Sequence, residues 1–519
     1  MQTAAPKSNL ALVVAGLLIG ILVSAMDNTI VATAMGSIVG DLGGLDKFVW
    51  VTSAYMVAEM AGMPIFGKLS DMYGRKRFFI FGLLVFLLGS ILCGTAQTIV
   101  QLSVYRAIQG IGGGALVPIA FAIMFDVIPA EKRGAMGGLF GAVFGLSSIF
   151  GPLLGAYVTD YIDWRWVFYI NLPLGLVAFV FVAFFYKESI RHAKQRIDWG
   201  GAITLVGSIV CLMFALELGG QKFAWGSAPI LGLFIGFAVL FLAFLFIEGR
   251  AAEPIISYDM FKIRLYASSS LIGIFSGAAF IVATVYIPIY IQGVQGGSAT
   301  NSGLLLLPMM LGSVASSQIG AMLAVKIGYR NVMFGSNIIL VTGIALLTTV
   351  TMDSSRLAVT LFMIVVGLGI GASFSVLGMA AIHHFDETKR GAANSTIVFL
   401  RSLGMAIGIT IFGIVQRNGF SDSLSSALGA ASGANPADSA ALPPAELLKD
   451  PRALLAPEAR AAIPADLLHR ITEALSSSIA RTFVWTLIPA VLGLICVFLM
   501  SRERVAIPGK PTVQSRSQA

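Results

Sequence analysis

Long apolar stretches alternate with short polar ones along most of the chain. A helix needs about 20 apolar residues to cross a hydrocarbon core of ~30 Å. Stretches of about that length are predicted as helices at 10–36, 48–67, 77–96, 99–125, 134–158, 165–187, 199–219, 228–248, 265–291, 300–325, 331–352, 356–382, 391–415 and 479–502. The pattern therefore predicts an all-α, polytopic membrane protein with fourteen transmembrane helices.

The polar stretch from Gly67 to Arg77 lies between the second and third predicted spans and predicts a tight hairpin loop at one membrane face. It contains four Lys or Arg residues, and short loops with such an excess lie on the cytoplasmic side. An even number of spans then places both termini on that side. We therefore predict a multi-pass protein of the inner (cytoplasmic) cell membrane, embedded in the lipid bilayer with both termini cytoplasmic.

Composition excludes several classes of protein. With 57% hydrophobic and 12% charged residues, the chain cannot cover a soluble globule with polar surface. The net charge of +8 is scattered over short loops, so no nucleic-acid partner is expected. Cys93, Cys211 and Cys496 lie in apolar stretches without neighbouring ligands, so neither a metal nor a disulfide is predicted. There is no catalytic triad or Walker A sequence, which argues against an enzyme, a cofactor and ATP as the energy source.

Two sequence repeats divide the chain into like halves. Lys132-Arg133-Gly134-Ala135 recurs as Lys389-Arg390-Gly391-Ala392, and the Gly110, Gly112, Gly114 pattern recurs at Gly367, Gly369 and Gly371, both at a shift of 257 residues. Two similarly oriented halves are the parallel repeat of transporters that bind their substrate between the halves. We predict six-helix halves at 1–190 and 263–504, an inserted transmembrane hairpin at 191–262 outside the transport path, and a cytoplasmic tail at 505–519.

Residues 416–478 contain no long apolar stretch and are rich in Ala, Ser, Pro and Gly. They are predicted to form a long external loop within the second half. Leu467, Leu468, Ile471 and Leu475 recur at helical spacing. Part of the loop is therefore either an amphipathic helix on the membrane surface or, in the alternative interpretation, an unstructured linker.

Several charged residues fall inside predicted spans, among them Arg401 in the thirteenth. Asp27 and Glu59 are carboxylic acids in the first and second spans, and Arg106 lies in the fourth at a depth similar to that of Asp27. A charged side chain costs at least ~2.5–3.5 kcal/mol at the bilayer centre, so such residues pair, face a cavity or serve function. We predict that Asp27 pairs with Arg106 and carries a proton, with Glu59 as a second acid of the site. The alternatives are a purely structural ion pair and a hydrogen-bonded buried carboxyl group.

Several motifs resemble those of one transporter family. The G-x-L-x-D-x-x-G-R-K-R pattern at 67–77, with Gly67, Asp71, Gly74 and Arg75, resembles the signature loop of the major facilitator superfamily. The segment around Arg106 resembles the second motif of that family. Gly151, Pro152 and Gly155 resemble its antiporter motif, although Ser147 and Ala156 replace two glycines.

The segment Trp164-Arg165-Trp166, with Asn171 and Pro173 following, is similar to the fourteen-helix drug:proton antiporters of this superfamily. The resemblance implies a major facilitator fold and proton-driven export of lipophilic or cationic small molecules by a monomer, which is multidrug efflux and antibiotic resistance. It also implies a cytoplasmic gate at Asp71 and Arg75. An importer or exporter of a specific metabolite, such as an amino acid or a lipid, remains the alternative.

Overall fold

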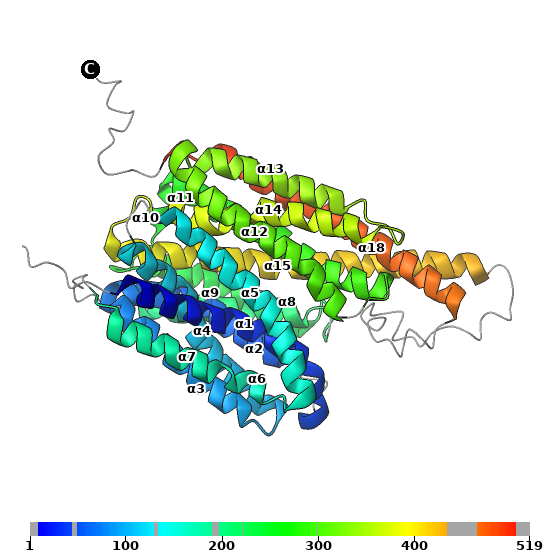
Figure 1. The fold of residues 1–519 in the computed structure, drawn as a ribbon, viewed down its shortest axis with the longest axis horizontal. Coiled ribbons are helices and arrows are strands. Elements are labelled where there is room, and N and C mark those ends of the chain that lie inside the picture. Colours follow the sequence, from blue (N-terminus) through cyan, green and yellow to red (C-terminus); the bar gives the residue numbers. More distant parts are fainter. Residues whose placement is uncertain are drawn as a thin grey trace, which may run out of the picture.

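A computed structural model describes residues 9–43, 49–128, 133–188, 197–220, 222–297, 299–432 and 464–504 (Figure 1). The predicted tail at 505–519 and the centre of the predicted loop at 416–478 lie outside these residues. The described chain is helical apart from turns and one isolated bridge between Gly219 and Phe223. The predicted all-α class is confirmed.

The first half consists of α1 (Leu10–Leu42), α2 (Val49–Tyr73), α3 (Arg75–Gly94), α4 (Ile99–Val127), α5 (Arg133–Tyr161), α6 (Trp166–Tyr169), α7 (Asn171–Val180) and η2 (Phe181–Phe185). The inserted segment contains α8 (Trp199–Leu218), α9 (Ala228–Glu248) and α10 (Tyr258–Lys262). The second half consists of α11 (Arg264–Ile289), η3 (Tyr290–Val294), α12 (Ala299–Ile327), α13 (Tyr329–Leu347), α14 (Arg356–Ala381), η4 (Glu387–Lys389), α15 (Arg390–Ser432) and α18 (Ala465–Leu499).

Thirteen of the described stretches are long and apolar enough to cross a membrane. Helix α2 corresponds to the remaining predicted span. It is also long, at 25 residues, but is less apolar because it contains Glu59, Lys68 and Asp71. The chain is therefore a multi-pass membrane protein, and its helices occupy the predicted stretches with different ends.

The predicted loop from Gly67 to Arg77 is wrong in extent. Helix α2 continues to Tyr73 and α3 begins at Arg75, so Gly74 alone breaks the helix, at φ 116°. A residue with a side chain rarely adopts this backbone conformation. The Asp71 and Arg75 side chains pair across the break at 2.8 Å. The polar residues of this stretch were expected to form a loop. They lie instead in the two helices, where the charged side chains of Asp71 and Arg75 pair with each other.

The predicted loop at 416–478 is also shorter than expected at both ends. Helix α15 runs to Ser432, and the last helix, α18, begins at Ala465 instead of near residue 479. Ile471 and Leu475 are buried in one cluster with Phe420 and Leu424 of α15. The apolar stripe therefore packs against α15 within the protein, and not on the membrane surface as one interpretation had it.

The two halves are built alike. Helix α2 packs on α4 as α12 packs on α14, and α1 packs on α5 as α11 packs on α15. The repeated glycines lie at these contacts. A Cβ at Gly110 would lie 2.4 Å from the Tyr55 carbonyl oxygen, and one at Gly367 would lie 2.0 Å from that of Met309. Small residues allow helix backbones to approach closely, which explains why this pattern occurs twice.

The basic end of the bundle is defined here by the Gly74 turn, the start of α15 at Arg390 and the residues that follow α18. Near this end, one buried cluster joins both halves and includes Phe125 of α4 and Met379 of α14. Towards the opposite end each half has its own cluster, one containing Phe168 and the other Phe483. Among the described residues, the halves thus share an apolar core at the basic end and have separate cores at the opposite end.

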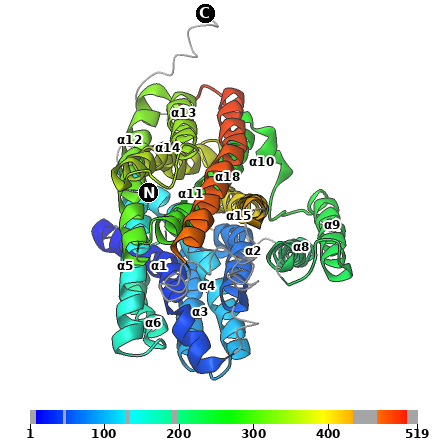
Figure 2. The same ribbon diagram turned by 90° about the vertical axis from the view of Figure 1, so that its right-hand side faces the viewer.

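The inserted hairpin lies beside the bundle (Figure 2). Leu205 and Ile209 of α8 are buried in a cluster with Met60 of α2 and Phe399 of α15, one helix from each half. Helix α9 lies beyond α8 and has large exposed apolar side chains, among them Ile235, Val239, Leu242 and Phe246. Such a surface is suited to lipid contact.

Candidate functional site

Asp27 of α1 and Arg106 of α4 form an ion pair through Asp27 Oδ2 and Arg106 Nη1, and both side chains are fully buried. The sequence predicted that these residues share a membrane depth and can pair, and the structure brings them together. Each charge offsets the cost of burying the other, because the pair is neutral as a whole. Arg106 also donates from Nε to the Val51 carbonyl oxygen at 3.3 Å.

The sequence did not identify the neutral groups that complete this pair. The amides of Gln109 and Asn171 donate to Asp27 Oδ1 at 2.8 Å and 2.9 Å, and both also donate to Ser90 Oγ. Together with Arg106, these amides give the Asp27 carboxylate three donors. The sequence did contain a signal for them. Gln109 belongs to the motif around Arg106 and Asn171 to the one that begins at Trp164, and both are polar residues in apolar surroundings.

Glu59 of α2 lies beside the pair. It interacts electrostatically with both Asp27 and Arg106, and its carboxyl group is in contact with the Asn28 side chain. Unlike Asp27, Glu59 is only half-buried. The guanidinium of Arg106 lies over the Tyr55 ring, 4.1 Å from its centroid. The site therefore contains two acids and one arginine, and Arg106 already pairs with one of the acids.

The second half has no equivalent charges at these positions. At the repeat shift, Met363 corresponds to Arg106. Ser313 corresponds to Glu59, because Gly371 meets the Ser313 carbonyl oxygen as Gly114 meets that of Glu59. The second half instead contains Arg401 of α15, which is buried with its guanidinium 4.9 Å from the Phe374 ring centroid. No acidic partner of Arg401 is found among the described residues.

A second charged cluster joins the halves at the basic end. Asp71 of α2 accepts hydrogen bonds from the backbone N–H groups of Gly391 and Ala392, at 3.0 Å and 2.8 Å. These groups are at the start of α15, where unpaired N–H groups and the helix dipole favour a carboxylate. Asp71 therefore caps a helix of the other half.

Arg75 binds Asp71 and also Asp126 of α4 through Nη1, and its side chain is fully buried. Asp126 in turn pairs with Arg390 of the second half at 3.5 Å. Gly67 lies at the closest approach, since a Cβ there would be 1.9 Å from Ser395 Oγ. The predicted gate residues Gly67, Asp71 and Arg75 thus lie between the halves or directly support residues that do.

The glycines of α5 lie against α1. A Cβ at Gly151 would lie 1.9 Å from Thr29 Oγ1, and one at Gly155 would lie 2.1 Å from Thr33 Oγ1. Thr29 also donates to the carbonyl oxygen of Ser147, four residues before Gly151 in α5, at 3.1 Å. Helix α5 packs on α12 of the other half as well. It therefore connects the helix that carries Asp27 with the interface between the halves.

Two similar helical halves, a buried ion pair within one of them and a charged contact between them define a membrane transporter. Residues 17–409 match the Major Facilitator Superfamily. The chain belongs to this family, whose members transport small molecules across membranes, so it is a transporter and not an enzyme.

Several characterised proteins are similar to the chain. Multidrug resistance protein 3 of Bacillus subtilis (strain 168) is 54% identical over 98% of this chain and 99% of its own length. Multidrug transporter protein MdtP of the same organism is 38% identical over 80% of this chain and 77% of its own. Among solved structures, the human organic anion transporter MFSD10 (TETRAN) matches with a TM-score of 0.59 at 15% identity, covering 95% of this chain and 100% of that one. The structural match shows the fold.

Proposed function

We propose that this protein exports lipophilic or cationic small molecules in exchange for protons, by alternating access between its two halves. The observation that carries the proposal is the buried Asp27–Arg106 pair with Glu59 beside it. A second acid next to a neutralised pair is suited to exchange a proton for a cation. The names of the similar B. subtilis proteins, which are a multidrug resistance protein and a multidrug transporter, support the substrate class.

The basic end is proposed to be cytoplasmic, with both termini on that side of the cell membrane and the protein acting as a monomer. Lys68, Arg75, Lys76 and Arg390 all lie at this end, and short positively charged segments stay in the cytoplasm. The described conformation then corresponds to a transporter closed towards the cytoplasm. The shared apolar core and the Asp71 contacts at this end support that assignment.

Of the two acids, Glu59 is proposed to carry the proton, and Asp27 to hold Arg106. Asp27 already pairs with Arg106 and accepts hydrogen bonds from Gln109 and Asn171. Among the residues that the structure describes, Glu59 forms no ion pair, and its side chain is half-buried. If Glu59 stays charged when the site closes, it leaves one uncompensated negative charge, which costs at least ~2.5–3.5 kcal/mol within a membrane. Protonation removes that cost, and a cationic substrate removes it equally well.

Proton and substrate therefore compete for one negative charge, which makes the exchange obligatory. A gradient supplies about 1.4 kcal/mol for each pH unit and about 2.3 kcal/mol for each 100 mV and charge moved. One proton at a typical gradient is therefore enough to drive severalfold accumulation of the exported molecule.

The alternative function, transport of a specific metabolite, is favoured by one observation. Arg401 is buried without an acidic partner among the described residues. An unpaired buried guanidinium is suited to an anionic or zwitterionic substrate, such as an amino acid. The two functions differ in the sign of the substrate charge that the site accepts.

Transport in inverted membrane vesicles tests both functions. Vesicles that contain the protein are expected to accumulate cationic dyes when acidified inside, and to lose this ability when a protonophore removes the gradient. Vesicles with Glu59→Gln protein serve as the matched control. Gradient-independent dye movement would contradict proton coupling. Accumulation of amino acids but not of dyes would favour the alternative.

A further inference from the structure

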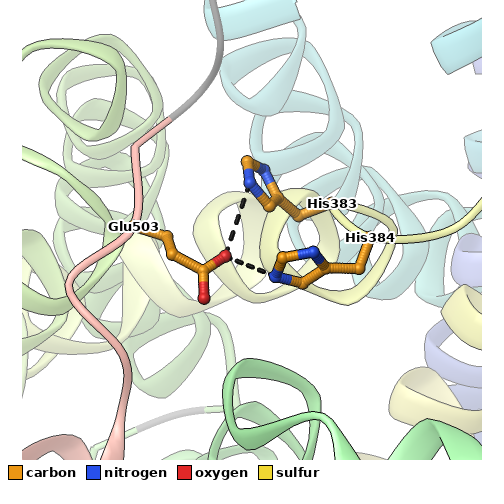
Figure 3. Close-up of side chains that lie close together, drawn as sticks. All are labelled: His383, His384 and Glu503. Carbon is orange, nitrogen blue, oxygen red and sulfur yellow. Dashed lines mark ion pairs between the residues drawn. The ribbon is translucent and has the colours of Figure 1, made fainter. Parts of the chain in front are cut away.

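Two histidines and a glutamate meet at the basic end of the second half (Figure 3). His383 and His384 follow α14, and Glu503 lies in the segment after α18. His384 Nε2 is 2.5 Å from Glu503 Oε2, and His383 Nε2 is 3.4 Å from the same oxygen. The ligand atoms of the three residues all lie within 4.8 Å of one another.

The surrounding backbone holds Glu503 in place. Its carbonyl oxygen accepts a hydrogen bond from the Tyr329 N–H at 3.0 Å. The preceding Gly328 has φ 88°, and a Cβ there would lie 2.7 Å from the same oxygen. In the side chain, Glu503 Oε1 accepts a hydrogen bond from Ser501 Oγ at 2.6 Å. The second carboxylate oxygen, Oε2, is therefore the one directed at the histidines.

The histidines are oriented in the same way. His383 Nδ1 is 3.1 Å from the hydroxyl of the buried Tyr329, which leaves Nε2 directed at Glu503. Metal-binding histidines commonly have such a partner on the ring nitrogen that does not bind the metal. The rings of His383 and His384 are nearly perpendicular, at 87°, with centroids 4.8 Å apart. Two imidazole nitrogens can thus face one oxygen from different directions.

The three facing atoms are all electron-pair donors when the imidazoles are neutral. Glu503 Oε2 is itself shielded from solvent and accepts no hydrogen bond from the residues that the structure describes. Lone pairs that face one another repel, so a positive species is needed between them. That species is either a proton on His384 or a metal ion.

We propose that His383, His384 and Glu503 form a binding site for a divalent transition-metal ion of the Zn²⁺ type. Two nitrogens and one oxygen from the protein, with a fourth position open to water, are a ligand set that Zn²⁺ accepts. Zinc bonds of about 2.0–2.1 Å require ligand atoms to lie roughly 3.4 Å apart in a tetrahedron. Binding therefore draws the outermost atoms together and lengthens the direct His384–Glu503 contact. The partly exposed His384 and Glu503 side chains give an ion access to the site.

Bound metal would join the segment after α18 to the connection between α14 and α15. That connection leads into the start of α15, where Asp71 of the first half binds Gly391 and Ala392. The ion would thus restrain the residues immediately before the contact between the halves.

Metal binding is measured directly on the full-length protein, purified without a histidine tag and stripped with a chelator. Calorimetric titration with Zn²⁺ alone is expected to show one site per chain, and elemental analysis after gel filtration one bound ion. His384→Ala and Glu503→Gln should each remove this site. Tyr329→Phe, which removes the hydroxyl beside His383 Nδ1, should weaken binding by about 10–100-fold.

The matched control is His469→Ala, because His469 is exposed in α18 and is distant in sequence from the cluster. This variant should bind Zn²⁺ as the unchanged protein does. Equal gel-filtration profiles establish that every variant is folded. If the unchanged protein retains no Zn²⁺, the positive species is a proton and the proposal is overturned. Equal Zn²⁺ binding by the unchanged protein and His384→Ala would also overturn it.

Discussion

Asp27 and Arg106 neutralise each other inside the first half, and Glu59 has no such partner in the described part of the chain. This difference assigns the residues separate tasks that substitutions can distinguish. In the proposed exchange, Glu59 takes up the proton, whereas Asp27 keeps the buried Arg106 neutralised. We therefore expect loss of either acid to stop coupled transport, and only loss of Asp27 to affect stability as well.

Glu59→Gln is expected to abolish gradient-driven export and substrate-induced proton release together, because a neutral amide cannot exchange a proton. Glu59→Asp should retain part of both activities. Dye accumulation in inverted vesicles and pH recording with the purified protein measure the two effects. If Glu59→Gln still exports against a gradient, Asp27 is the proton carrier that the sequence first indicated.

Asp27→Asn is expected to stop transport and also to destabilise the protein, since it leaves the Arg106 charge buried without a partner. Removing one member of a buried pair costs about 3–5 kcal/mol. Thermal unfolding in detergent measures this loss. The double substitution Asp27→Asn with Arg106→Gln should recover much of the stability without recovering transport. An Asp27→Asn protein as stable as the unchanged one would contradict the role of the pair.

At the scale of helices, the stretch from Gly67 to Arg77 forms close helix contacts where a loop was predicted. The signature stretch after Gly67 is helical except at Gly74, and its polar groups bind residues of α4 and α15. Such contacts can hold one end of the transporter shut and separate as the halves rock. Helix α5 packs on both α1 and α12 and so connects the helix that carries Asp27 with the other half.

Asp71→Asn is expected to reduce transport strongly while insertion into the membrane stays normal. An amide can accept at only one of the two positions that bind Gly391 and Ala392, and it cannot pair with the charged Arg75. Asp386→Asn is the matched control, because Asp386 is an exposed acid of the connection that precedes α15. Vesicle transport and surface labelling measure both variants. Normal transport by Asp71→Asn would remove the gate role.

Gly155→Val is expected to separate α1 from α5 and to lower both stability and transport. The new side chain would collide with Thr33 Oγ1 and the Ile30 carbonyl oxygen. Overpacking of this kind costs about 1–3 kcal/mol. Gly36→Val is the control, since a Cβ at Gly36 in α1 meets no atom within 4 Å. Thermal unfolding of the two variants should therefore differ, and equal melting temperatures would contradict the close α1–α5 contact.

At the scale of the whole molecule, the inserted hairpin lies beside the contact between the halves. Helix α8 packs against α2 and α15, and α9 presents an apolar surface beyond it. The helix contacts of the first half recur in the second half, and neither α8 nor α9 is needed for this correspondence. We therefore keep the proposal that the hairpin is peripheral to transport.

Photo-crosslinking checks this proposal. A light-activated cationic substrate is expected to label α1, α2 and α4 near Glu59, and an excess of unlabelled substrate should abolish that labelling. Peptides of α8 and α9 should be labelled weakly and without competition, as lipid-facing surfaces are. Competed labelling chiefly within 199–248 would place the hairpin in the transport path.

The sequence by itself determined the membrane class, the position of the spans, the basic face, the twofold repeat and the charged residues inside the membrane. These features follow from the lengths of the apolar stretches and the positions of the charges along the chain. Neither depends on how the helices pack. The family resemblance carried by residues 67–77 and 151–155 led to the same superfamily as the comparison with known proteins.

Apart from the Asp27–Arg106 pair, only the tertiary structure decided which polar residues meet. Gln109, Asn171 and Ser90 complete the Asp27 site from three different helices. His384 and Glu503 come together from segments far apart in the chain. The helical continuation to Tyr73 likewise depends on partners in α4 and α15. Hydrogen bonds and ion pairs between helices depend on the face that each helix presents, and one sequence without its fold does not specify that face.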